Sequence, residues 1–239
     1  MTDLAQPASS PSASYWEDFV DIFYAPSSVF ARREHGNPWI PMLFSTVIFA
    51  LLMYASTQLL APMWDAEWSR ASAKIMEKNP QITADQLAQM RSFSSVGVIM
   101  TGVFAVPLMM LVAGLVSWIV GKLLDARQTL RAAFVVAAFA TFPFLLEQVV
   151  YLLQGVLMDP ASLTSRWAVV VSPARFMNPD GSAVLLALAE RLNPFNIWFA
   201  ALLAIGLKVT GRITTRQAAI AGVVLWILGA LPAAFAAGQ

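Results

Sequence analysis

Residues 92–121 read SFSSVGVIMTGVFAVPLMMLVAGLVSWIVG, a stretch without a single formal charge. The hydrocarbon core of a bilayer is about 30 Å thick, and an α-helix crosses it in roughly 20 apolar residues. The stretch is therefore long enough to cross a membrane as one helix. It predicts the class of fold, because an uncharged run of this length belongs in lipid.

The composition of the whole chain agrees with a membrane protein. Of its 239 residues, 58% are hydrophobic and 12% are charged, whereas an ordinary globular chain is roughly 25% charged. Too few polar side chains are present to cover a soluble surface, so apolar residues must face lipid. The net charge of +1 excludes a global attraction to nucleic acid. The lack of cysteine excludes disulfides and thiolate metal sites.

Four further stretches meet or nearly meet the length that a membrane span needs. They cover residues 39–60, 132–157, 194–210 and 218–237. The stretch that contains Glu147 is interrupted by that residue alone. We predict an all-α, multi-pass transmembrane helical bundle with about five spans. Residues 1–38 then form an N-terminal tail with interfacial amphipathic helices, and residues 39–239 form the membrane domain.

Basic residues mark one side of the predicted bundle. They lie before the first span, in the loop after the second and in the turn after the fourth. These three segments fall on the same side of the membrane if the five spans alternate in direction. These residues are Arg32, Arg33, Lys122, Arg127, Arg131, Lys208, Arg212 and Arg216. Because short cytoplasmic loops are enriched in basic residues, we predict a cytoplasmic N-terminus and a C-terminus outside.

Two short helices are predicted before the first span. Ser14-Tyr-Trp-Glu17 has the pattern of a capping box, and Pro26 ends the helix that follows. One face of this helix is apolar and the other acidic: Trp16, Phe19, Val20 and Phe23 against Glu17, Asp18 and Asp21. The pair is expected to lie along the cytoplasmic membrane surface, with packing against the protein's own cytoplasmic loops as the alternative.

Two segments resemble a known family. In residues 19–30, FVDIFYAPSSVF, the aromatic residues Phe19, Phe23 and Phe30 surround the helix-ending Pro26. Residues 192–198, LNPFNIW, lead into the fourth span with Asn193, Pro194, Phe195 and Trp198. Together with five helices, these segments resemble the Yip family, the Ypt/Rab-interacting membrane proteins, in its bacterial branch.

The resemblance covers nearly the whole chain in layout and implies a five-span membrane protein. Eukaryotic members of the family are associated with vesicle traffic, through small GTPases and other membrane proteins. The polar N-terminal region of this chain is much shorter than theirs, so the resemblance implies a GTPase partner only weakly. For the bacterial branch it implies the bacterial inner membrane and no established activity.

A carboxyl group inside the third predicted span is the main candidate for function. Glu147 lies about 22 Å along that helix, beside Gln148. A carboxylate in hydrocarbon is costly, so Glu147 is expected to be protonated, paired or facing a wet cavity. It is either a proton- or cation-linked site or a buried group bonded to a neighbouring helix or loop. Pro143 is expected to kink this helix, and Pro107 is a hinge or a static bend in the second span.

Small residues mark two helix faces that allow close approach of other helices. They are Gly114, Ser117 and Gly121 in the second predicted span and Gly222 and Gly229 in the fifth. Internal packing explains them, with self-association as the alternative. At the start of the fourth span, Asn193 suits a helix cap and Pro194 suits the first turn. A binding role for this motif is the alternative.

No combination of residues in the sequence indicates catalysis. The chain has one histidine, His35, which excludes a multi-histidine metal site. It has no phosphate-binding glycine loop and no serine-hydrolase elbow. We predict no enzyme, no catalytic residue, no cofactor and no metal. The predicted function is a membrane organiser that binds lipid, itself or other membrane proteins. The alternative is a small transporter or channel that uses Glu147.

Overall fold

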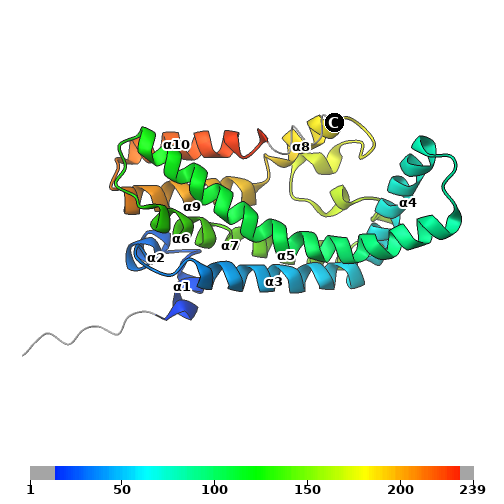
Figure 1. Ribbon diagram of the computed structural model, residues 1–239, viewed down its shortest axis with the longest axis horizontal. Helices are drawn as coiled ribbons and strands as arrows, with labels where there is room; N and C mark the ends of the chain where they lie inside the picture. Colours follow the sequence, from blue (N-terminus) through cyan, green and yellow to red (C-terminus); the bar gives the residue numbers. More distant parts are fainter. Residues whose placement is uncertain (1–13, 232–239) are drawn as a thin grey trace, which may run out of the picture.

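The computed structural model describes residues 14–231, apart from the side chains at positions 95 and 101. Every regular element in this range is helical (Figure 1). Four helical segments are long and apolar enough to cross a membrane: α3 (Trp39–Leu59), α5 (Ala84–Leu123), Leu130–Leu157 and α9 (Pro194–Gly211). The prediction of an all-α, multi-pass bundle is thus confirmed.

The fifth predicted span begins within α10 (Thr215–Leu228), which is apolar but shorter than the other four. A capping box at Thr214 starts this helix, because the Thr214 hydroxyl accepts from the backbone N–H of Gln217 at 3.3 Å. Helix α10 packs along α9 (Figure 1). Residues 232–237 of the predicted span lie outside the described part of the chain, so a fifth crossing stays a prediction.

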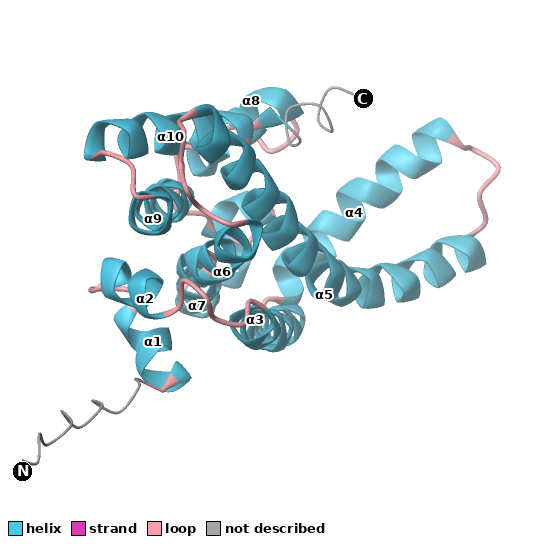
Figure 2. Cartoon of the chain, turned by 60° about the vertical axis from the view of Figure 1, so that its left-hand side comes forward, coloured by secondary structure: helices cyan, strands magenta, loops and turns pink. Residues whose placement is uncertain are grey.

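Helix α5 is longer than the second predicted span. It starts directly after the capping box at Thr83 and continues to Leu123 through Pro107 without a break. A helix of that length measures about 60 Å, twice the hydrocarbon thickness. Its first turns and helix α4 (Ala61–Lys78) extend away from the bundle as an arm (Figure 2). Pro107 therefore lies in a continuous helix and does not divide it.

The third predicted span consists of two helices. Helix α6 (Leu130–Ala140) stops at Thr141, and α7 (Phe142–Leu157) continues from there with Pro143 in its first turn. Proline has no N–H to bond to the preceding turn, and its ring clashes with the carbonyl four residues earlier. At this break the Thr141 hydroxyl donates to the backbone carbonyl of Ala138 at 2.7 Å. This break lies just before the turn of α7 that carries Glu147.

The two ends of the bundle are built differently. At one end, which we call the hairpin end, α1 (Tyr15–Asp21) and α2 (Pro26–Arg32) lie beside the first turns of α3 (Figure 1). At the opposite end, the α4 end, α4 projects from the bundle and a loop with four short helices follows α7. These are η1 (Pro160–Ser162), η2 (Arg166–Val169), η3 (Pro173–Phe176) and α8 (Ala183–Glu190).

Polar contacts hold α4 to this loop. Arg70 pairs with Asp180 at 3.1 Å and donates to the Thr164 carbonyl at 2.5 Å. The Glu67 carboxylate accepts from the backbone N–H of Arg166 at 2.8 Å. The α4 end is therefore a covered surface above the spans and not a set of free loops.

Close helix packing depends on glycine where α6 meets α9. A Cβ atom at Gly206 of α9 would lie 2.2 Å from Cγ1 of Val136 in α6. Val136 is fully buried in the main apolar cluster of the bundle. No side chain fits between these helices at that point, so the glycine sets how closely they approach.

Candidate functional site

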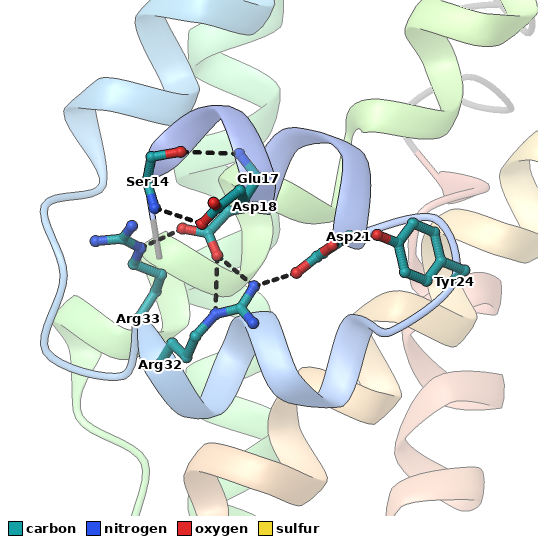
Figure 3. A network of polar contacts seen from close by, with 7 residues as sticks. All are labelled: Ser14, Glu17, Asp18, Asp21, Tyr24, Arg32 and Arg33. Atoms are coloured by element: carbon teal, nitrogen blue, oxygen red, sulfur yellow. Dashed lines mark hydrogen bonds and ion pairs between the residues drawn. The ribbon is translucent and has the colours of Figure 1, made fainter. Parts of the chain in front are cut away.

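The two helices of the hairpin are joined to each other through one buried carboxylate, Asp18 (Figure 3). Asp18 is fully buried and accepts from Arg32 at 2.7 Å, and it also bonds to Arg33. Sequence analysis placed Asp18 on a polar face with Glu17 and Asp21, but that face of α1 packs against α2. Two guanidinium groups replace the water that the carboxylate loses, which makes its burial tolerable.

The apolar residues of the hairpin belong to the core of the bundle. Ile22, Val29 and Phe30 are fully buried, and Phe19 is 8% exposed. The Phe19 ring stacks on Phe44 of α3 with 4.2 Å between centroids. These hairpin residues therefore pack against the long helices of the bundle.

The outer face of the hairpin is apolar and aromatic. Trp16 is 70% exposed, Tyr24 is 71% exposed and Val20 is 59% exposed. Trp39 at the start of α3 is also exposed. Tryptophan and tyrosine are enriched where a protein meets the membrane–water boundary, since their rings are apolar and their edges polar. The hairpin thus has one face in the bundle and one face for lipid or a partner.

Glu147 lies in a cluster of polar side chains from α7, α8 and the start of α9. Its Oε1 atom accepts from the Tyr151 hydroxyl at 2.5 Å and from the Asn193 amide. The same amide donates to Oε1 of Glu190 at 2.9 Å, and the Ser172 hydroxyl donates to the other oxygen of Glu190 at 2.5 Å. We call these five residues the carboxyl cluster. It brings together two acidic side chains and three groups that donate to them.

The carboxyl cluster is nearly enclosed by protein. Glu147 is 7% exposed and Asn193 is fully buried. The side-chain oxygen of Asn193, Oδ1, also accepts from the backbone N–H of Phe195 at 2.9 Å, so Asn193 caps α9 as well. Asn193 therefore caps α9, as the sequence predicted, and also bonds to the acidic pair.

Two cavities meet at the carboxyl cluster. One has a volume of about 790 Å³ and lies between α3, α5 and α7, with Glu147 in its wall. The other has a volume of about 900 Å³ and lies under α4 and α8. Gln148, Tyr151 and Glu190 line both of them. Glu147 thus faces a cavity and is also hydrogen-bonded, so the two sequence-based alternatives for it do not exclude each other.

Only part of this site could be found in the sequence. Glu147 and Gln148 were identified there, and Asn193 was identified as a cap. Tyr151, Ser172 and Glu190 were missed. The spacing of four residues from Glu147 to Tyr151 places both on one helix face, which is a signal that was available. Glu190 comes from a segment joined to α7 only through tertiary packing, and no local pattern marks it.

The predicted small residues pack within the chain. A Cβ atom at Gly114 would lie 2.5 Å from the Phe134 ring, and one at Gly121 would lie 2.8 Å from Leu207. Ser117 between them is fully buried. A Cβ atom at Gly222 of α10 would lie 2.9 Å from Cβ of Ala204. One at Gly229, the C-cap of α10, would lie 2.9 Å from the guanidinium of Arg191. These contacts leave no need for self-association to explain the pattern.

The long apolar helices, the covered α4 end and the packed hairpin define a multi-pass α-helical membrane protein. The chain belongs to the Yip1 domain family, which it matches over residues 20–236. No curated protein and no solved structure gives a significant match. The resemblance seen in the two aromatic segments is thereby confirmed at the level of the family. The match extends from α1 past α10, so hairpin, bundle and α4 end are parts of one domain.

Proposed function

We propose that this protein is a non-enzymatic organiser of the bacterial inner membrane, which binds neighbouring membrane proteins and lipid through its N-terminal hairpin. The exposed aromatic face of the hairpin, with Trp16 in α1 and Tyr24 in the turn after it, supports the proposal. A helix that only anchored the chain could lie loosely on the bilayer. Here the same helix is fixed to the bundle, so Trp16 and Tyr24 keep a constant position relative to the spans.

The attachment of the hairpin is strong enough for such a role. Burial of a large apolar side chain contributes roughly 1.5–3 kcal/mol, and four such residues of the hairpin are buried: Phe19, Ile22, Val29 and Phe30. Within the hairpin, the Asp18 ion pairs hold α1 to α2, and removal of one partner from such a buried pair costs about 3–5 kcal/mol. The hairpin is therefore expected to act as a rigid part of the bundle.

Site-specific crosslinking in intact cells tests this function. A photoreactive residue is placed at Trp16, Val20 or Tyr24, one position at a time, and the products are identified by mass spectrometry. Phe104 on α5, which is 71% exposed, is the matched aromatic control. Protein adducts at the hairpin positions but not at the control support the proposal. Lipid adducts alone at all four positions would remove the partner-binding part of it.

A second candidate is transport of a small cation or proton, and the position of Glu147 in the wall of a cavity favours it. Its test is solute or proton flux into vesicles that contain either the native protein or Glu147→Gln. A lower flux for the variant supports transport through this site. Equal flux from both, no higher than that of empty vesicles, would eliminate this candidate.

A further inference from the structure

We infer that the cavity between α3, α5 and α7 is a binding site for a phospholipid whose head group carries a primary amine. The ammonium group would lie at Glu147 and Glu190, the phosphate toward Arg166, and the acyl chains along α3 and α5. The inference concerns binding only. It requires neither transport nor a function of the hairpin.

The size and lining of the cavity fit the apolar part of such a ligand. Its volume of about 790 Å³ lies within the range of about 300–1,000 Å³ typical of ligand sites. Apolar side chains of three helices line it, among them Phe49, Val106 and Leu145. Gly97 of α5 also lines it, and a Cβ atom there would meet nothing within 4 Å. The space beside Gly97 is open.

The acidic end of the cavity lacks a cation. Within residues 14–231, neither Glu147 nor Glu190 takes part in an ion pair. The nearby Arg191 donates instead to Asn196 at 2.9 Å and to the Trp226 carbonyl at 2.8 Å. Two neighbouring carboxyl groups are stabilised in their charged form by a cation between them. A ligand can supply that cation.

The hydrogen bonds of Glu147 leave room for a donor. Both of its hydrogen bonds with described residues go to Oε1, so Oε2 has no donor among these residues. An ammonium group has three N–H donors and no acceptor. It can therefore bond to oxygens of both carboxyl groups at once, which a trimethylated amine cannot do because it has no N–H.

A buried hydroxyl group in the same cavity gives independent support for a polar ligand. Ser45 of α3 lines the cavity and is 1% exposed. Its Oγ atom has no hydrogen-bond partner among the described residues. A buried polar group without a partner is destabilising, and native structures contain few of them. A polar atom of a bound ligand would satisfy it.

Arg166 supplies the complementary charge for a phosphate. It lines both cavities, and its guanidinium lies 4.6 Å from the centroid of the Trp167 ring. Arginine is well suited to phosphate because its donors form a planar fork. Glu190 also lines both cavities, so a basic and an acidic side chain lie where the cavities meet, which matches a head group that carries both a phosphate and an amine.

The test compares lipids that differ in one group. The full-length protein is purified, and retention of phosphatidylethanolamine, phosphatidylcholine and phosphatidylglycerol is measured by native mass spectrometry over a titration. We expect phosphatidylethanolamine to bind at least about ten times more tightly than the other two. Equal retention of the three lipids would overturn the inference. Water-soluble phosphoethanolamine, which has the head group without acyl chains, is titrated as well. If it binds as tightly as phosphatidylethanolamine, the acyl chains have no role in binding.

Two variants locate the site. Glu147→Gln removes a carboxylate and is expected to weaken binding of phosphatidylethanolamine about ten- to a hundredfold. Glu77→Gln on α4 changes an exposed carboxylate outside the cavity and should leave binding unchanged. Gly97→Leu fills the open space without a clash at Cβ, so it should abolish binding even if Glu147→Gln fails to fold. Native affinity in Gly97→Leu would contradict the site, whatever the crosslinking and flux experiments show.

Discussion

The rings of Phe23 and Trp198 lie edge to face, with 5.8 Å between their centroids. Phe23 lies in the turn just after α1, and Trp198 belongs to the first turns of α9, so the contact joins the two segments in which the family resemblance is visible. Edge-to-face aromatic pairs are favourable by about 0.5–1.5 kcal/mol beyond their buried area. The two motifs are thus far apart in sequence but form parts of one packed structure.

The buried ion pairs of Asp18 are expected to determine hairpin stability. Asp18→Asn removes the charge that faces Arg32 and Arg33, so it should destabilise the protein by about 3–5 kcal/mol. Asp65→Asn is the control, because Asp65 also pairs with an arginine, Arg91 at 2.6 Å, but is 61% exposed. An exposed pair contributes about 0–1 kcal/mol. Thermal unfolding in one detergent measures both variants, and equal melting temperatures would contradict this prediction.

The contact between α6 and α9 should not tolerate a methyl group. Gly206→Ala places Cβ against the stiff, β-branched Val136, and we expect a loss of about 1–3 kcal/mol in unfolding free energy. Gly97→Ala should be neutral or slightly stabilising, since a Cβ atom there meets nothing within 4 Å. Val136→Ala combined with Gly206→Ala should recover stability relative to Gly206→Ala alone. Absence of this recovery would show that the clash is not the cause.

The sequence was sufficient for the class of fold and for most helix positions. Uncharged runs such as residues 92–121 have only one environment that suits them, and composition alone therefore identified a membrane bundle. The break at Thr141 was also accessible, because Pro143 removes a backbone donor. Local pattern and tertiary structure agree in these segments.

The carboxyl cluster and the hairpin contacts could not be predicted in the same way. Asp18 has the helical spacing of a solvated face, and only the position of α2 turns that face inward. Glu190 meets Glu147 because the loop after α7 folds back over the α4 end of the bundle. Periodicity describes which residues share a face of one helix, but not which other element covers that face.

Acid is expected to weaken the hairpin through Asp21. The Tyr24 hydroxyl donates a hydrogen bond to Asp21, and Arg32 pairs with it, so the pKa of this carboxyl group lies below its ordinary value. A lowered pKa in the folded state stabilises the fold above the unfolded-state pKa of about 3.9. This contribution is therefore present at neutral pH and is lost as the pH falls below about 4.

The lack of cysteine in the chain makes the measurement simple. A fluorophore on Val20→Cys reports whether the hairpin stays docked as the pH is lowered from 7 to about 2, a window that brackets the carboxyl titration. In an Asp21→Asn background, docking should be weaker at neutral pH and its dependence on acid should be shallower. An identical acid profile in both backgrounds would show that Asp21 does not contribute.

The double role of Asn193 gives the most discriminating substitution series. Asn193→Ser and Asn193→Asp both keep a side-chain oxygen that can cap α9, and a lost cap would cost only about 1 kcal/mol. Asn193→Asp, however, replaces the amide donor by a third acidic group beside Glu147 and Glu190. It should therefore destabilise the protein more than Asn193→Ser, because like charges in a buried site repel and the two carboxyl groups lose a donor. Chemical unfolding of the native protein and the two variants in the same detergent gives the order of their unfolding free energies. If Asn193→Asp is as stable as the native protein, Asn193 serves only as a helix cap.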